Sequence, residues 1–269
     1  MKTYNDTKAI IKKWYDALSF DKAFDSDFAY ALESIHISED TNISMYDKDT
    51  DDGRKNLLSY LYMCEELKHR YAQKGIGDDI LIDTLSDLPR WTDTWSEIKG
   101  GLYLGELHWL CHHLDFKLFK LGRLQFCFGK AECDIESIGV KKGDNTIEIH
   151  IPACGALTPD ECQRSIDMAK EFYKKFFPEY EYKCFTCHSW LLDESLKKLL
   201  GENSNIIKFG NMFEKVYSEK SDDIVQYVFR WDKKRSDVAT LPCHTSLAQK
   251  VKDYIAQDGE FHLVYGFLK

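Results

Sequence analysis

The chain has 269 residues, a formal net charge of −9, 43% hydrophobic residues and 14% aromatic residues. This length is sufficient for one large domain or two small ones, and the hydrophobic fraction is ordinary for a globular protein. A negative net charge without a basic stripe excludes a nonspecific nucleic-acid binder.

The N-terminus is polar and charged, and no apolar run approaches the length of a membrane-spanning helix. We therefore expect a cytoplasmic protein with neither a membrane nor a nucleic acid as partner. Nine cysteines are scattered through apolar segments. An odd count in that setting predicts free, buried thiols in a reducing compartment.

Residues 1 to about 118 are predicted to be helical. Ile10, Ile11, Trp14 and Leu18 form a first apolar stripe at helical spacing. A segment rich in Asp, Ser and Thr at 38–53 predicts a loop. The further predicted helices cover residues 24–35, 54–74, 78–85, 88–99 and 104–114. Gly75 is expected to end the longest of them.

From Leu121 onward the apolar period changes to the alternation typical of strands. Strands are predicted at residues 123–128, 147–151, 182–190 and 261–267, with a hairpin of strands at 213–217 and 224–231. Helices are predicted at 162–176, 193–200 and 245–256. The pattern indicates an α/β (α+β) protein, with a helical domain at 1–118 packed on a mixed-sheet domain at 119–269.

The segment 145–161 is the most informative part of the chain. Ile147, Ile149 and Ile151 alternate with Glu148 and His150, so one strand face is apolar and the other carries two ionisable groups. Those groups are candidates for taking a proton from an amine. A pair of polar side chains satisfied by neighbouring strands explains the pattern equally well.

The turn after this strand has the composition of a phosphate-binding loop. Pro152 ends the strand, and Thr158 with Glu161 forms a capping box at the start of a helix. Backbone N–H groups at Gly155 to Leu157 would donate hydrogen bonds to a pyrophosphate. Asp160 and Glu161 already neutralise the positive helix terminus, which disfavours a bound anion, and Arg164 would offset their charge. The alternative interpretation is a plain turn that connects the strand to the helix.

Cys187 and Ser189 are expected on one face near the end of the next strand. A cysteine nucleophile would need a base such as His150, but filling of the core is the favoured interpretation of Cys187.

Two metal-related motifs are present. His108 and His112 are four residues apart, which suits two zinc ligands on one helix face, and Cys184, Cys187 and His188 have the spacing of a haem-attachment motif. A packing helix and two sheet cysteines are the favoured interpretations, so no metal site is predicted.

Several segments resemble one bacterial family of acyltransferase-domain proteins, which pair an N-terminal N-acyltransferase-like domain with a GNAT-like C-terminal domain. The segments are Gly101-Leu-Tyr-Leu-Gly-Glu-Leu-His-Trp109, Phe119-Lys-Leu-Gly-Arg-Leu-Gln-Phe126, Ile147-Glu-Ile-His-Ile-Pro152, Cys187-His-Ser-Trp-Leu-Leu-Asp193, Ser204-Asn-Ile206 and Leu241-Pro-Cys-His-Thr-Ser-Leu247. The resemblance covers most of the chain and is densest after Gly100.

The resemblance implies a GNAT fold, in which acyl-CoA lies where two central parallel strands separate. Its pyrophosphate then meets the turn after the first of them. The expected cofactor-binding residues are Ile151, Cys154, Gly155, Ala156, Leu157 and Arg164. GNAT turns usually have the pattern Arg/Gln-x-x-Gly-x-Gly/Ala, whereas this chain has Pro152-x-x-Gly155-x-Leu157, so only the first glycine matches.

The implied function is acyl transfer from acyl-CoA to an amine of a small molecule or peptide. The expected catalytic residues are His150, Glu148 and Ser189, and the two ionisable side chains should lie about 7 Å apart along the strand. We favour His150 as the base, with Glu148 orienting the substrate. The alternatives are a noncatalytic binding or sensor protein with the same fold, and a metal-dependent hydrolase that uses His108 and His112.

Overall fold

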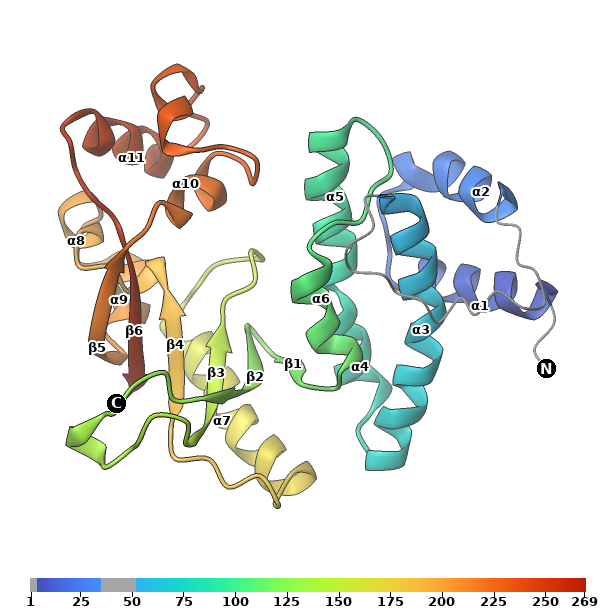
Figure 1. The fold of residues 1–269 in the computed structure, drawn as a ribbon, viewed down its shortest axis with the longest axis horizontal. Coiled ribbons are helices and arrows are strands. Elements are labelled where there is room, and N and C mark those ends of the chain that lie inside the picture. The colour runs from blue at the N-terminus through green and yellow to red at the C-terminus, as the bar shows by residue number, and fades with distance from the viewer. Residues whose placement is uncertain (1–3, 35–51) are drawn as a thin grey trace. The chain divides into compact units, whose positions relative to one another are not determined.

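The computed structural model describes residues 4–34 and 52–269, and the side chains from residue 6 onward within them (Figure 1). Most of the loop predicted at 38–53 lies outside these residues. The chain divides into two compact units, Met1–Lys120 and Leu121–Lys269, each of which has its own core.

The first unit is built of helices. They are α1 (Tyr4–Ala17), α2 (Asp25–Ser34), α3 (Gly53–Lys74), α4 (Asp78–Leu85), α5 (Asp87–Lys99) and α6 (Leu107–Leu114). The Asp52 carboxylate caps α3 by accepting a hydrogen bond from the Lys55 N–H at 3.1 Å. Gly75 ends it with φ of 75°, a left-handed conformation that glycine adopts without strain.

Helix α3 is the central element of this unit. Its predicted apolar stripe is buried, and α1 packs against it, with Ile11 and Trp14 of α1 also buried. The residues of the α3 stripe are Leu57, Leu61, Cys64, Leu67 and Tyr71.

The second unit contains a mixed sheet flanked by helices. Its strands are β1 (Leu118–Leu121), which begins before the boundary of the unit, β2 (Leu124–Lys130), β3 (Asn145–His150), β4 (Phe185–Ser189), β5 (Phe213–Lys220) and β6 (His262–Leu268). Its α-helices are α7 (Pro159–Phe176), α8 (Leu196–Leu199), α9 (Asn205–Gly210), α10 (Asp223–Val228) and α11 (Ser246–Ala256).

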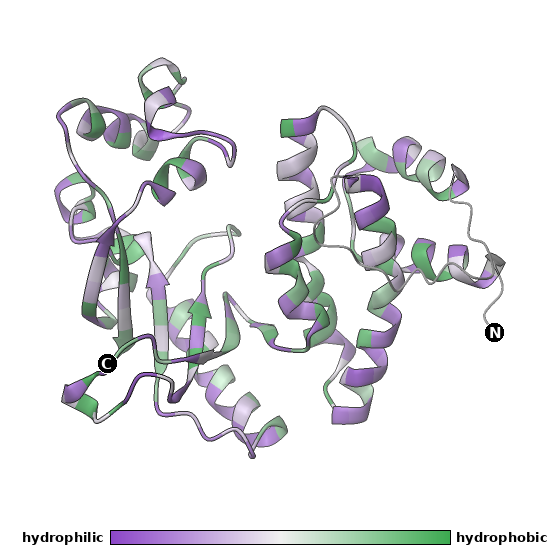
Figure 2. Cartoon of the chain, in the orientation of Figure 1, coloured by the Kyte–Doolittle hydropathy of each residue, from purple (hydrophilic) through white to green (hydrophobic). Residues whose placement is uncertain are grey.

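The strand order is β1-β2-β3-β4-β6-β5. Only β3 and β4 are parallel among the pairs recorded from β2 to β5, and α7 is the crossover that connects them. Hydrophilic and hydrophobic residues are mixed along α7 (Figure 2). Its buried face includes Cys162, Ile166 and Tyr173, and the Tyr173 hydroxyl donates a hydrogen bond to the Phe126 carbonyl of β2 at 3.1 Å. The predicted mixed α/β fold is thus confirmed.

One predicted element is wrong. The segment 224–231 does not form a hairpin with 213–217, because β5 pairs antiparallel with β6 instead, and α10 is helical. Ile224 and Val225 pack from α10 into a core cluster with Val251 and Phe261. A short apolar run suits a buried strand and a buried helix equally, so its period alone could not decide between them.

Some predicted boundaries also shift. β4 is shorter than the predicted strand at 182–190, and Ile151 lies just beyond the end of β3. Within the described residues, no helix is both long enough and apolar enough to cross a membrane.

Candidate active site

The two parallel strands separate at their carboxyl ends. β3 and β4 pair only at Ile147 with Phe185 and at Glu148 with Thr186. β3 continues to His150 and β4 to Ser189 without further pairing between them. The carboxyl ends of parallel strands are where α/β folds place their ligands, so this divergence is the centre of the candidate site.

One face of the sheet at this point carries ionisable side chains. Ile147 and Ile149 are at most 1% exposed on the face that α7 covers, whereas Glu148 and His150 are about a quarter to a third exposed on the other face. The Nε2 atom of His150 lies 3.6 Å from Oε2 of Glu148. This is closer than the 7 Å repeat of a strand because the two side chains lean towards each other.

A second histidine lies on the same face, on β4. Because Glu148 pairs with Thr186, the alternation places His188 on the side of Glu148 and His150. The His188 Nδ1 atom lies 3.1 Å from Oε1 of Glu132, in the loop after β2. The Tyr217 hydroxyl of β5 donates a hydrogen bond to the other oxygen of Glu132. Burial and this carboxylate raise the pKa of Tyr217, so its phenol stays protonated.

The cross-strand register supports this cluster. His188 pairs with Tyr265 of β6, and Tyr265 pairs with Tyr217. The rings of Tyr217 and Tyr265 stack with centroids 5.4 Å apart. The Glu132 carboxylate at Nδ1 orients the His188 ring, and the other ring nitrogen, Nε2, lies 3.8 Å from Oε1 of Glu219.

The turn after β3 is organised by capping at one end and by an arginine beneath it. Gly155 has φ of 57°, and Gly155 and Ala156 are exposed. Thr158 caps α7 by accepting from the Glu161 N–H at 3.4 Å. The Glu161 carboxylate accepts from the Thr158 hydroxyl rather than from a backbone N–H, so the predicted capping box forms only in part.

Arg123, in the turn between β1 and β2, donates hydrogen bonds to backbone carbonyls of the turn after β3. Among the described residues, the N–H groups of Gly155, Ala156 and Leu157 have no hydrogen-bond partner. These donors are therefore available to an anionic ligand.

The remaining predicted site residues are placed as follows. Ser189 ends β4 on the opposite face of the sheet from His188, Glu148 and His150, and its hydroxyl oxygen accepts from the Leu191 N–H at 3.2 Å. Cys154 lies within the turn, with its sulfur 3.8 Å from an Arg123 nitrogen. Arg164 is exposed on the first turns of α7. Ile151 follows β3 directly and is partly exposed.

Sequence reasoning missed three residues of this region. His188 has a place in the haem-like motif and in the resemblance but was assigned no role in this site, although the alternation in β4 places it on the face of Glu148. Glu132 and Arg123 have no such signal, because each lies in a loop or turn whose course in space the sequence pattern does not predict.

The metal motifs form no centre. Within residues 4–34 and 52–269, no group of three or more His, Cys, Asp or Glu side chains could hold a metal ion. All nine cysteines are free, including Cys184 and Cys187 of the haem-like motif.

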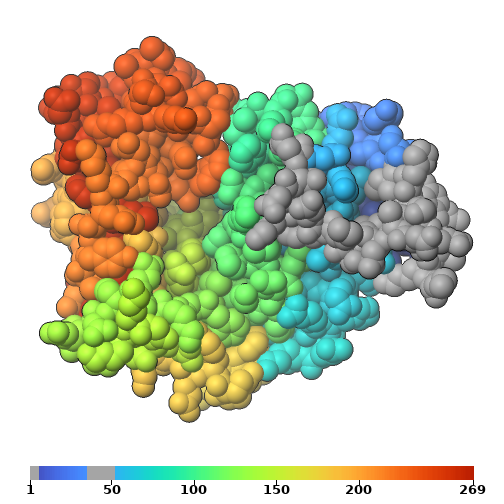
Figure 3. Space-filling model, viewed as in Figure 1, coloured from blue at the N-terminus to red at the C-terminus, as the bar shows by residue number. Residues whose placement is uncertain are grey.

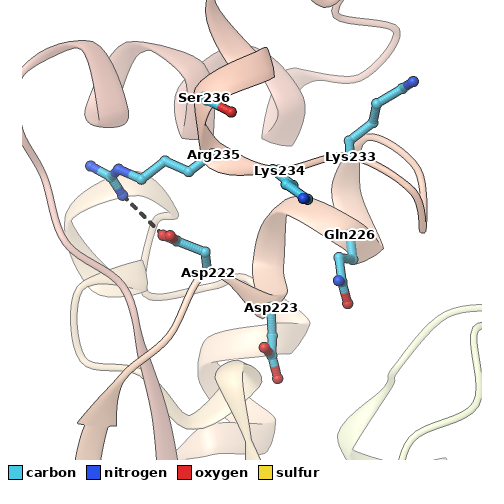
Figure 4. Close-up of a pocket in the computed structure, with 7 residues that line it drawn as sticks. All are labelled: Asp222, Asp223, Gln226, Lys233, Lys234, Arg235 and Ser236. Atoms are coloured by element: carbon cyan, nitrogen blue, oxygen red, sulfur yellow. Dashed lines mark hydrogen bonds and ion pairs between the residues drawn. The ribbon is translucent and has the colours of Figure 1, made fainter.

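Two cavities occur elsewhere in the second unit. One, of about 770 Å³, lies beside β5 and β6 and is lined by residues that include Asp193, Lys215 and His262. The other, of about 400 Å³, lies between α10 and the segment 233–236. This part of the chain, orange in Figure 3, contributes to the face of the molecule in view. In this cavity, Arg235 pairs with Asp222 at 3.2 Å (Figure 4). Neither contains the ionisable groups of β3.

A mixed sheet whose two parallel strands diverge, with a crossover helix that follows a short glycine turn, is the architecture of the GNAT-like acyltransferase class. The family comparisons agree. Residues 118–268 match the GNAT-like C-terminal domain, and residues 6–116 match the N-acyltransferase N-terminal domain. The chain belongs to this two-domain N-acyltransferase family, as the resemblance predicted.

Solved structures of acyltransferases are similar in fold. One in complex with CoA and 10C-teicoplanin is 25% identical, with a TM-score of 0.71 over 80% of this chain and 66% of that chain. Another, with decanoyl-CoA, is 24% identical over 79% of this chain and 64% of that one, with a TM-score of 0.69. A third, with decanoyl-CoA and teicoplanin, is 21% identical, with a TM-score of 0.78 over 96% of this chain and 87% of that chain.

The chain thus spans slightly less than two thirds of the length of the first two structures. A comparison with curated proteins found no match.

Proposed function

We propose that the protein transfers an acyl group from acyl-CoA to an amine. The observation that carries this proposal is the divergence of β3 and β4 beside a turn with free backbone donors. Three of the similar acyltransferases were solved with CoA, decanoyl-CoA or octanoyl-CoA, which supports the same co-substrate here.

In this proposal the thioester lies between the separated strands. The pyrophosphate accepts hydrogen bonds from the N–H groups of Gly155, Ala156 and Leu157. Ile151 and Cys154 line the path towards them, and Arg164 contributes positive charge from α7.

The reaction is a direct displacement. The amine nitrogen attacks the thioester carbonyl, the C–N bond forms, the C–S bond breaks, and CoA leaves as a thiolate that takes up a proton. A base must remove the proton from the attacking nitrogen. We propose His150 for this role, with Glu148 orienting the substrate amine; Ser189 contributes its hydroxyl beside the thioester.

The pair His188–Glu132 is the rival base. Its carboxylate orients the imidazole, which is the arrangement of a hydrogen-bonded base. The two histidines lie on the same face, on neighbouring strands, so substitution can separate their roles.

The acceptor is proposed to be an amine of a small molecule or peptide. The teicoplanin in two of the similar structures is a glycopeptide, which supports an acceptor with a peptide part. The free thiols of all nine cysteines support a reducing, cytoplasmic location, and the family resemblance supports a bacterial source.

Calorimetric titration with acetyl-CoA, octanoyl-CoA and decanoyl-CoA tests the proposed co-substrate. We expect at least one of them to bind at micromolar concentration. Failure of all three to bind at millimolar concentration would rule out the proposal.

With a working acylation assay, His150→Ala should lower kcat by about a hundredfold while acyl-CoA affinity changes little, because a general base contributes on that order. His188→Ala and Glu132→Gln are the matched comparison. If only these two lower kcat, the base is His188. If none of the three does, this face of the sheet has no part in proton transfer.

A noncatalytic sensor with the same fold remains the second candidate, because Glu148 and His150 lie within ion-pair distance of each other. Tight acyl-CoA binding without transfer to any amine would favour it.

A further inference from the structure

The turn between β1 and β2 is fixed against α7. The N–H groups of Arg123 and Leu124 both donate to the hydroxyl oxygen of Ser165, at 2.7 and 3.3 Å. Ser165 is fully buried on α7. Gly122 has φ of 72°, and a Cβ atom built on it would lie 2.8 Å from the same oxygen. Only glycine fits at this position. The two hydrogen bonds to Ser165 hold the backbone at Arg123 in one place.

From that position the Arg123 side chain reaches the turn after β3. Its Nε donates to the carbonyl of Ala156 at 2.8 Å and its Nη1 to the carbonyl of Pro152 at 3.0 Å. Its Nη2 lies 3.4 Å from the carbonyl of Gly155. One guanidinium thus holds three carbonyls of a six-residue turn, which its planar fork of donors makes feasible.

These carbonyl contacts decide where the N–H groups point. In a planar trans peptide, the C=O and the following N–H point in opposite directions. Because the carbonyls of Gly155 and Ala156 face Arg123, the N–H groups of Ala156 and Leu157 face away from it. The guanidinium also brings a positive charge to the turn that leads into α7, whose first turn carries the acidic residues Asp160 and Glu161.

We infer that Arg123 is a positioning residue that preorganises the turn for the diphosphate of acyl-CoA, acting through the backbone rather than by touching the acyl group. This inference rests on the proposed function and adds to it a residue from a distant hairpin. The Pro152-x-x-Gly155-x-Leu157 sequence of the turn lacks an arginine of its own, and Arg123 supplies a guanidinium to it from outside.

The test compares two ligands that differ in the diphosphate. Decanoyl-CoA and decanoyl-pantetheine are titrated into the intact wild-type protein and into Arg123→Ala, Arg123→Lys and Lys174→Ala. Lys174 is an exposed lysine in the last turn of α7, so its removal controls for the loss of one cation.

We expect Arg123→Ala to weaken decanoyl-CoA binding at least tenfold and to leave decanoyl-pantetheine unchanged within about twofold. Arg123→Lys should lose most of the same affinity, because one ammonium group cannot hold three carbonyls. Lys174→Ala should bind both ligands like the wild type. In the acylation assay, the Arg123 variants should raise KM for decanoyl-CoA with little change in kcat.

Two results would overturn the inference. One is an Arg123→Ala protein that keeps the wild-type preference for decanoyl-CoA over decanoyl-pantetheine. The other is an equal loss for both ligands together with a lower melting temperature, which would reveal a purely structural role.

A ligand-free measurement separates this inference from the proposed function. Amide hydrogen exchange across residues 153–157 should be faster in Arg123→Ala than in the wild type. Unchanged exchange would contradict the positioning role, whether or not the wild type binds acyl-CoA.

Discussion

At the scale of single residues, the burial of Cys187 decides between two chemistries. Its side chain is fully buried in the middle of β4. Burial, with the nearby charge of Glu148 as a smaller cause, raises the pKa of the thiol well above its usual range. A thiolate is therefore not available near neutral pH, which agrees with the proposed direct attack by the amine.

We expect Cys187→Ala to retain acyl transfer within about threefold of wild type and to lose about 1 kcal/mol of stability through the small cavity left behind. In the folded wild-type protein at pH 8, iodoacetamide should label the partly exposed Cys243 but not Cys187, as read by peptide mass spectrometry. Rapid alkylation of Cys187 accompanied by loss of activity would instead support a role for Cys187 as a nucleophile.

The positions of the candidate site residues were not equally predictable from the sequence. Glu148 and His150 were predictable because a strand alternates with a period of two, and the burial of Ile147 and Ile149 follows from the same rule. The contacts of Arg123 and Glu132 were not predictable. They depend on where hairpins and loops return in space, which no local period encodes.

At the scale of elements, a partly buried ion pair links α1 to α3. Glu65 accepts hydrogen bonds from Lys13 Nζ at 2.7 Å and from Trp14 Nε1 at 2.9 Å. Burial acts to raise the pKa of Glu65, but the hydrogen bonds from Lys13 and Trp14 outweigh it, so the pKa is lowered.

Because folding lowers the pKa of Glu65, its ionised carboxylate stabilises the folded protein at pH values above the ordinary pKa of 4.5. This contribution is lost as the pH falls through the lowered pKa of the folded state. We expect Glu65→Gln to cost about 1 kcal/mol at pH 7. The difference from wild type should shrink in denaturant titrations at pH 3.5. A difference that stays constant or grows on acidification would refute this role for the pair.

Elements with local signals were predicted well. The bounds of α3 and α4 follow from apolar spacing, the Asp52 cap and the Gly75 stop. The sequence predicts the strand β5 but not its pairing partner. Its partner is β6, which lies more than 40 residues further along the chain, and no local pattern indicates such a distant pairing. Tertiary packing also selected helix over strand for α10.

At the scale of the whole molecule, hydrogen exchange measured in peptides from both units can show which unit binds a ligand. We expect saturating acyl-CoA to slow hydrogen exchange most in peptides that cover 147–157 and 185–190. At a hundred times Kd, binding adds about 2.7 kcal/mol to the stability of the bound state. Peptides from α1, far from the divergent strands in sequence, are the internal comparison. Protection confined to α1 and α3 would place the ligand outside the proposed site.

Strand β5 lies at the edge of the sheet, and its register with β6 shifts between Lys215 and Tyr217. An open strand edge invites a strand from another molecule, which leads to aggregation. The irregularity twists this edge, and exposed charges such as Glu219 and Lys220 lie along it. Both features oppose strand addition, so this margin of the sheet protects the protein against self-association when it is concentrated.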